Sequence, residues 1–197
     1  MSTYLPTVAA HARPGAYKDL IDAARARGAD YSRIWDLFAF QHDVTLHLGR
    51  FTQGVLRQPA SISAGFRELI AAYTSLLNEC AFCTEAHAAA AAELLGGEAF
   101  VWKVLRDPEG SALEDRDKAM LRLVARVTRD LPGVGSGDVQ AVRDAGWDDE
   151  AIYFAITTCA LFNFYNRWIT ATGVPVMSRE AHREQGRMLA TRGYTRA

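Results

Sequence analysis

The segment from Asp148 to Gly173 constrains the fold more than any other part of this sequence. It reads DDEAIYFAITTCALFNFYNRWITATG, and on a helix its apolar side chains lie on nearly every side. A helix with that distribution has to be buried, because no face of it suits water. The segment therefore predicts a long helix at the centre of the protein.

Helix patterns continue through most of the chain, whereas strand patterns are scarce. Apolar residues recur at helical spacing between stops such as Gly28, Pro59 and Gly146. They predict helices over residues 16–28, 31–58 with a break in the middle, 63–79, 84–97, 99–106, 114–129 and a short stretch ending at 146, followed by a polar, frayed helical tail over 178–197. The expected fold is all-α, in one domain, with roughly seven to ten helices.

The composition narrows the choice of function. Hydrophobic residues make up 49% of the chain and charged residues 23%, as in an ordinary soluble protein, and the formal net charge is −1. Such a balance provides no basic field for nucleic acid or anionic lipid. No apolar run approaches the roughly 20 residues of a membrane helix. Residues 1–14 lack the basic start and apolar stretch of a signal peptide. We expect a cytoplasmic protein with no nucleic-acid or membrane partner.

Reactive side chains are concentrated in NECAFCTEAH, residues 78–87, which holds two of the three cysteines and one of the five histidines. Because each helical residue turns by about 100°, Cys80, Cys83, Thr84 and His87 fall on one helix face. A thiol at the start of that helix lies among free backbone N–H groups at the positive end of the helix dipole, which favours the thiolate. A thiolate beside a second thiol is the usual arrangement for reducing a peroxide or exchanging disulfides.

Glu68 joins this cluster only if the chain turns back. On one continuous helix it would lie roughly 18 Å from Cys80. If the chain reverses just before Cys80, two antiparallel helices form a hairpin, and Glu68 faces the turn that carries His87. The carboxylate could then orient the imidazole, leaving its other nitrogen to handle a proton of Cys83. The alanines from Ala88 to Ala92 would let the two helices approach closely.

The pattern Glu68, eleven residues, Cys80-Ala-Phe-Cys83, three residues, His87 resembles the signature of the AhpD-like alkylhydroperoxidases of the carboxymuconolactone decarboxylase superfamily. The surrounding segment RELIAAYTSLLNECAFCTEAHAAAAAELLG and the later FNFYNRWITATGVP are similar to segments of that family. A CxxC with a spaced glutamate and histidine is far more specific than a CxxC alone.

The resemblance implies a fold and its division along the chain. The fold is an AhpD-like helical bundle with the CxxC at the start of a helix in a helical hairpin. Residues 1–197 form a single all-α domain, in which 1–58 is an N-terminal helical extension, 60–176 is the AhpD-like core and 178–197 is a polar tail.

The resemblance also implies a peroxidase, with an antioxidant role. By analogy Cys83 is the peroxidatic thiol, Cys80 resolves its sulfenic acid to a disulfide, and Glu68 with His87 forms the proton relay. Phe82 stands where the best-known members carry a second histidine, so this relay has one member fewer. The implied partners are a hydroperoxide substrate and a thiol reductant, for which a lipoylated protein is the family precedent. No cofactor and no metal is implied.

A homo-oligomer is expected for two reasons. The family is oligomeric, with active sites near subunit contacts. In addition, the aromatic-rich stretch Tyr31–Phe51 and the apolar segment 148–173 offer more apolar surface than one small helical domain readily covers.

Other interpretations of the cluster stay open. A CxxC is also half of a zinc site, although the sequence offers no fourth ligand beside Cys80, Cys83 and His87. A cofactor-free decarboxylase of the same superfamily would use Glu68 and His87 without needing paired thiols. A non-catalytic redox-sensing oligomer would use the disulfide to change a partner surface.

Polar residues on the 148–173 helix need a separate explanation. Asn163 and Arg167 are i, i+4 neighbours, with Asn166 between them on a largely apolar helix. Because buried polar groups have to be paired, we interpret these three as a hydrogen-bond network that supports the site rather than as catalytic groups. Cys159 on the same helix is interpreted as a small core residue.

Overall fold

The computed structural model describes residues 3–195, and within that range it contains eleven α-helices, one short 3-10 helix and no strand. The predicted all-α class is confirmed. None of the described helices is both long and apolar enough to cross a lipid bilayer. In chain order the helices are α1 (Pro6–Ala10), α2 (Ala16–Ala26), α3 (Ile34–Phe40), α4 (His42–Arg57), α5 (Ala64–Leu77), α6 (Ala81–Leu95), α7 (Glu98–Arg106), α8 (Asp115–Arg129), η1 (Leu131–Gly133), α9 (Ser136–Asp144), α10 (Asp149–Thr172) and α11 (Arg179–Arg192).

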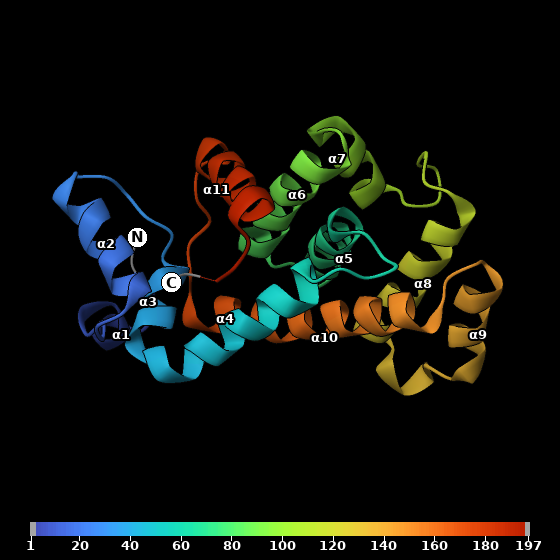
Figure 1. Cartoon of the computed structure of the whole chain (residues 1–197), viewed down its shortest axis with the longest axis horizontal. Helices are drawn as coiled ribbons and strands as arrows, with labels where there is room; N and C mark the ends of the chain where they lie inside the picture. Colours follow the sequence, from blue (N-terminus) through green and yellow to red (C-terminus); the bar gives the residue numbers. More distant parts are fainter. Residues whose placement is uncertain (1–2, 196–197) are drawn as a thin grey trace.

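The α10 helix is the long central helix that the sequence predicts. The Asp148 carboxylate accepts the backbone N–H of Ala151 at its start, and Gly173 ends it in the left-handed conformation (φ 72°). It runs through the middle of the molecule and packs against α4, α5, α8 and α9 (Figure 1). Its burial is incomplete, because Tyr153 and Phe164 are 62% and 48% exposed.

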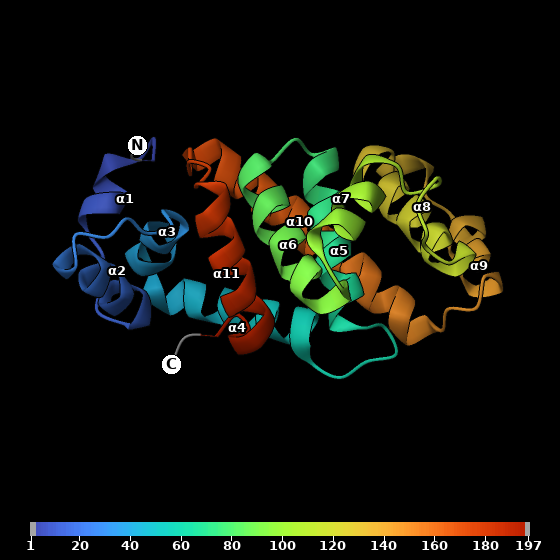
Figure 2. The ribbon, with the colours of Figure 1, turned by 90° about the horizontal axis from the view of Figure 1, so that it is seen from above.

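The described helices bury their apolar side chains in three cores. One core joins α5, α6, α7, α8, α9 and α10, a second joins α3, α4, α5, α6 and α10, and a small third joins α2 and α3. The N-terminal helices α1–α3 lie at one end of the molecule and α8–α9 at the other, with α11 between α3 and α6 (Figures 1 and 2). The predicted break in the segment 31–58 falls at Gln41, which separates α3 from α4.

The α5 and α6 helices pack directly against each other, and the chain turns between them in three residues. The Ser63 hydroxyl caps the start of α5 by accepting the backbone N–H of Phe66 at 3.1 Å. At the other end, Glu79 takes a left-handed conformation (φ 57°), which is uncommon for a residue with a side chain. The backbone N–H of Cys80 donates to the carbonyl of Ser75 at 2.9 Å. This turn places Cys80 at the N-terminus of α6.

The C-terminal segment differs from the frayed tail expected from its polarity. The α11 helix packs closely along α6, and its residues His182, Gly186 and Leu189 are buried. A Cβ atom at Gly186 would lie 2.5 Å from the Cβ of Ala89, so a glycine is needed at this contact. Part of the alanine run of α6 therefore forms the surface against which α11 packs. This contact was not predicted from the sequence. The five-residue α1 was also not predicted, because it is too short to show helical periodicity.

Candidate functional site

The two cysteines of the CxxC lie on the first turn of α6, and both are free thiols. Cys80 is the N-cap residue and Cys83 follows three residues later, with exposed fractions of 3% and 1%. The Thr84 hydroxyl donates to the Cys80 carbonyl at 3.0 Å. The structure thus puts both sulfurs at the positive end of the helix dipole, shielded from bulk water.

The two thiols differ in their readiness to ionise. The hydrogen bond from the Cys83 thiol, with smaller contributions from Thr170 and Asn166, lowers the pKa of Cys80 to about 6 against the opposing effect of burial. The same hydrogen bond and burial raise the pKa of Cys83 well above its ordinary value. Of the two sulfurs, Cys80 is therefore the one that ionises more readily.

Glu68 and His87 are brought together by the packing of α5 against α6. The Glu68 Oε2 atom lies 2.7 Å from His87 Nδ1, and Glu68 is completely buried. The ring of Phe162, from α10, meets the imidazole edge-on with 4.3 Å between ring centroids. Because Nδ1 is held by the carboxylate, Nε2 is the ring nitrogen left to exchange a proton.

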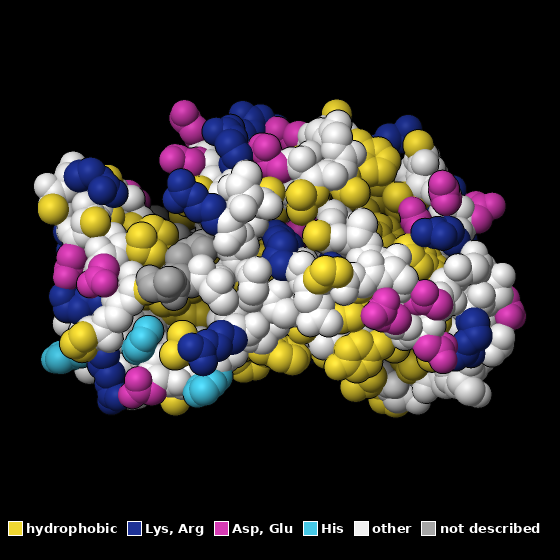
Figure 3. Space-filling view, viewed as in Figure 1, with side chains coloured by type: hydrophobic (Ala, Val, Ile, Leu, Met, Phe, Trp, Pro, Cys, Tyr) yellow, Lys and Arg dark blue, Asp and Glu magenta, His cyan; other side chains and the backbone are white. Residues whose placement is uncertain are grey.

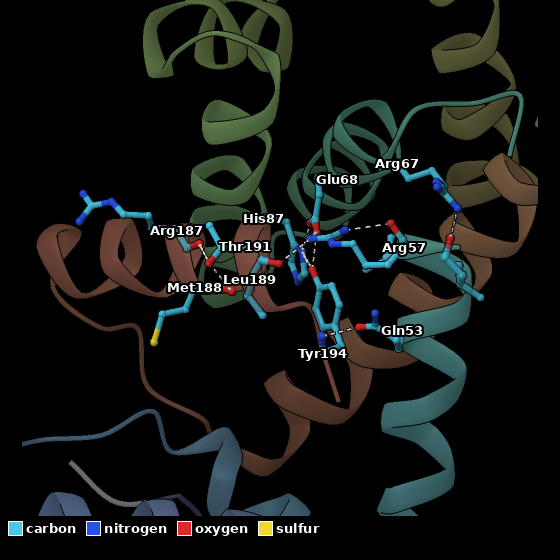
Figure 4. A network of polar contacts seen from close by, with 12 residues as sticks. Gln53, Arg57, Arg67, Glu68, His87, Arg187, Met188, Leu189, Thr191 and Tyr194 are labelled. Carbon is cyan, nitrogen blue, oxygen red and sulfur yellow. Dashed lines mark hydrogen bonds and ion pairs between the residues drawn. The ribbon is translucent and has the colours of Figure 1, made fainter. Parts of the chain in front are cut away.

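Two further residues, Arg57 and Tyr194, complete the surroundings of the buried carboxylate (Figure 4). The Arg57 guanidinium and the Tyr194 hydroxyl each donate to Glu68 Oε1 at 2.5 Å. Burial alone would raise the pKa of Glu68, but the His87 hydrogen bond and charge, the Arg57 charge and the Tyr194 hydroxyl together hold that pKa below its ordinary value. Glu68 is therefore a carboxylate at neutral pH, with three partners.

The three polar residues of α10 are joined to the turn before Cys80. The Asn78 amide donates to Asn163 Oδ1 at 3.1 Å and to Asn166 Oδ1 at 2.9 Å. The Asn166 amide in turn donates to the Ser75 hydroxyl at 2.9 Å, and Arg167 donates to Asn163 Oδ1 at 2.8 Å. The network thus ties α10 to the end of α5, and Asn166 also contributes a hydrogen bond to the thiols.

A mostly apolar pocket lies over the second thiol. Its walls come from the N-terminal helices α2 and α3, from α4, α6 and α10, and from the C-terminal segment. The lining residues are Tyr17, Ile34, Trp35, Phe38, Thr52, Phe82, Cys83, Ala86, His87, Phe162, Tyr165, Ile169, Gln185, Leu189 and Tyr194. Cys83 and His87 line this pocket, whereas Cys80 does not. A small apolar molecule that enters it therefore meets Cys83 first.

Several residues of the site were missed from the sequence. Arg57 and Tyr194 lie far from the CxxC along the chain and carry no motif of their own, so only tertiary packing reveals them. His182 is 1% exposed, its ring meets Phe82 edge-on with 5.5 Å between centroids, and burial lowers its pKa to about 4. A neutral histidine of α11 thus contacts Phe82, which lies between the two cysteines of the CxxC.

Fold and site together define a class of protein: an all-α bundle whose helical hairpin carries a buried dithiol beside a glutamate–histidine pair. No group of three or more histidine, cysteine and acidic side chains suited to hold a metal ion occurs within residues 3–195.

Residues 43–95 match the model of the carboxymuconolactone decarboxylase family. Among solved structures, the chain is similar to a peroxidase-related protein from Silicibacter sp. TM1040, with 23% identity, a TM-score of 0.72 and coverage of 86% of this chain and 88% of that chain. It is also similar to a peroxidase-related protein from Ralstonia eutropha JMP134, described as an alkylhydroperoxidase AhpD core, with 21% identity, a TM-score of 0.74 and coverage of 89% and 93%.

No curated protein matches the chain significantly in sequence. At these identities the structural likeness establishes the fold, which is that of the AhpD core. The predicted resemblance to this superfamily is confirmed by the family model and by the fold. The match at residues 43–95 includes α5 and α6, the two helices that carry the dithiol and the Glu68–His87 pair.

Proposed function

We propose that the protein is a cysteine-based hydroperoxide reductase, a thiol–disulfide oxidoreductase that uses Cys80 and Cys83 with a proton relay of Glu68 and His87. The observation that carries this proposal is the arrangement of the four groups. A dithiol with one readily ionised sulfur lies beside a buried carboxylate–imidazole pair, and its second thiol lines an apolar pocket. Supporting it, both structural relatives are described as peroxidase-related.

The proposed reaction consumes both thiols. The Cys83 proton passes to Cys80 along the hydrogen bond between them, and the Cys83 sulfur attacks the terminal oxygen of ROOH. The O–O bond breaks, the departing alkoxide takes a proton from His87, and Cys83 becomes a sulfenic acid. The Cys80 sulfur then attacks Cys83, which forms the disulfide and releases water with the proton that Cys80 held. The products are ROH, water and a disulfide.

The position of each residue in the site determines the role that we assign to it. Cys83 is the peroxidatic thiol because it lines the pocket, and Cys80 is the resolving thiol because it lies behind Cys83 at the helix start. Glu68 orients His87 through Nδ1, so that Nε2 delivers the proton to the leaving oxygen. Two electrons from a thiol reductant return the disulfide to the dithiol, and a lipoylated protein is the candidate that we would test first.

Counting free thiols tests this proposal. One equivalent of cumene hydroperoxide should oxidise the Cys80 and Cys83 thiols and leave the Cys159 thiol reduced. Cys159 lies on α10 and is buried in the hydrophobic core. Cys83→Ser should abolish turnover, whereas Cys159→Ser is the matched control and should leave it unchanged. Dihydrolipoamide, thioredoxin and glutathione are then supplied separately as electron donors. An unchanged thiol count would remove the proposed function.

A second candidate is a cofactor-free decarboxylase, which the family model at residues 43–95 favours. Its chemistry would use Glu68 and His87 for proton transfer and would leave the thiols idle. The Cys80→Ser/Cys83→Ser double variant separates the two functions. Full activity of that variant on a lactone or β-keto acid substrate would favour the decarboxylase, and its loss of peroxide reduction would favour the peroxidase.

We also propose that the chain forms a homo-oligomer through an apolar face of α4 and α10. Val44, Phe51, Tyr153 and Phe164 are between 48% and 68% exposed, and Figure 3 shows hydrophobic side chains along the edge where these helices run. Exposed apolar patches of this kind mark association surfaces. A protein that reduces peroxide slowly, and whose oligomer size differs between the reduced and oxidised forms, would be a redox sensor instead.

A further inference from the structure

The chain that follows α11 turns back onto α4 and brings Tyr194 into the site. Gly193 adopts a left-handed φ of 67°, and a Cβ atom there would lie 2.3 Å from the side-chain oxygen of Gln53. The backbone N–H of Tyr194 donates to that same Gln53 oxygen at 2.6 Å. Arg57, one turn further along α4, donates to the carbonyl of Leu189 at the end of α11 at 3.0 Å. The turn is thus fixed to α4 at two points.

The Tyr194 side chain contacts both members of the acid–imidazole pair (Figure 4). Its hydroxyl lies 2.5 Å from Glu68 Oε1 and 3.3 Å from His87 Nδ1. Its ring stacks parallel to the imidazole, with an interplanar angle of 11° and 6.2 Å between centroids. The Arg57 guanidinium lies 5.0 Å from the centre of the tyrosine ring.

The Tyr194 hydroxyl acts as a hydrogen-bond donor and does not ionise. Burial and the nearby Glu68 charge raise the pKa of Tyr194 well above its ordinary value. A phenol that stays protonated is a fixed donor, and a donor next to a buried carboxylate stabilises the anion. The same ring lines the pocket over Cys83.

We propose that Tyr194 is a positioning residue: its hydroxyl holds Glu68 as the anion that orients His87, and its ring closes the pocket beside Cys83. The proposal rests on the proposed function, because positioning matters only if the Glu68–His87 pair works on the thiol site. It assigns a role to a residue outside the segment 43–95 that matches the family model, and it makes the C-terminal turn part of the active site.

The hydroxyl and the ring have separable consequences. Without the hydroxyl, Glu68 Oε1 keeps only Arg57, so the carboxylate is less stabilised and its pKa rises. A hydrogen bond to a charged group changes an equilibrium constant by roughly tenfold, which corresponds to about one pH unit. Without the ring, the pocket loses a wall and binds an apolar hydroperoxide less well.

Three variants test the proposal, with kcat and KM for peroxide turnover measured separately. Tyr194→Phe keeps the ring, and its kcat should fall roughly tenfold while KM for cumene hydroperoxide stays unchanged. Tyr194→Ala should show the same fall in kcat and a raised KM. Tyr4→Phe, at an exposed tyrosine before α1, is the matched control and should behave as wild type. An unchanged kcat for Tyr194→Phe would overturn the proposal.

A readout that does not depend on activity separates this proposal from the proposed function. The carboxyl stretch of protonated Glu68 is identified in infrared spectra as the band that Glu68→Gln lacks. In Tyr194→Phe this band should appear at a pH about one unit higher than in wild type. If wild type fails to reduce peroxide but the band shifts, the proposed function fails and Tyr194 still positions Glu68. If peroxide is reduced and the band does not shift, only the positioning role fails.

A glycine substitution covers the case in which the tyrosine variants unfold. Gly193→Ala leaves the Tyr194 side chain intact but displaces its backbone from Gln53, because the new Cβ has no room and the φ is left-handed. It should raise the pH of the carboxyl band as Tyr194→Phe does. Gly137→Ala, at a glycine of α9 with open space around it, is the control. A Gly193→Ala protein with the wild-type band position would count against the proposal.

Discussion

Replacing Glu68 with glutamine should destabilise the protein strongly, although the two side chains have nearly the same shape. Glu68 is completely buried, and it provides the counter-charge for Arg57, whose side chain is only 12% exposed. Glutamine preserves the volume and some hydrogen bonds but leaves the guanidinium without an anion. Breaking one partner of a buried ion pair costs roughly 3–5 kcal/mol. We therefore expect the free energy of unfolding to fall by about 3 kcal/mol or more.

The pH dependence of that loss identifies its cause. The folded-state pKa of Glu68 lies below its ordinary value, so the stabilisation is fully present above the unfolded pKa of about 4.3 and declines as pH falls through the folded pKa. Urea unfolding followed by circular dichroism should show a large gap between wild type and Glu68→Gln at pH 7. The gap should narrow below about pH 4.

A partly exposed carboxylate that also forms ion pairs with arginine is the control. Glu98 pairs with Arg179 and Arg183 at the surface of the molecule. Exposed pairs of this kind contribute little to stability, so Glu98→Gln should unfold close to wild type. Equal effects of Glu68→Gln and Glu98→Gln, or a gap for Glu68→Gln that does not change with pH, would refute the argument from burial.

Three other expectations concern the thiols, the α6–α11 contact and the exposed face. The ultraviolet absorbance of a thiolate should titrate at a pH of about 6 in wild type, and at a higher pH in Cys83→Ala, which removes the stabilising hydrogen bond to Cys80. Gly186→Ala should lower the free energy of unfolding by roughly 1–3 kcal/mol in thermal or urea melts, because the new Cβ overpacks the α6 contact. Phe51→Glu/Phe164→Glu should shift the sedimentation profile to a smaller species, and a wild type that is monomeric at micromolar concentration would contradict the oligomer.

The helices were predictable where apolar side chains alone decide the packing. The α10 segment is apolar on most of its surface, and α5 carries a clear apolar stripe, so both were recognised from local pattern. The α11 segment was predicted to be helical but frayed, and its packing was missed because its buried residues are His182, Gly186 and Leu189, of which only one is strongly apolar. Their spacing of four and three residues is helical, and this is the signal that could have revealed a packed helix.

The site was predictable as far as sequence spacing reaches. The turn before Cys80 makes Glu68 and His87 neighbours, which the hairpin hypothesis anticipated together with the family resemblance. The contacts of Arg57 and Tyr194 with Glu68 depend on how α4 and the segment after α11 pack against that hairpin. No local sequence pattern predicts this packing. The order of the two thiol pKa values likewise depends on hydrogen bonds that only the folded chain supplies.

The most direct test of the central claim is a product balance for a single turnover. Reduced protein is mixed with one equivalent of cumene hydroperoxide, the alcohol is quantified, and the protein is digested without reduction for mass spectrometry. The account predicts one cumyl alcohol per chain and a peptide in which Cys80 and Cys83 are joined by a disulfide. Hydroperoxide that persists while both sulfurs stay reduced would contradict the account.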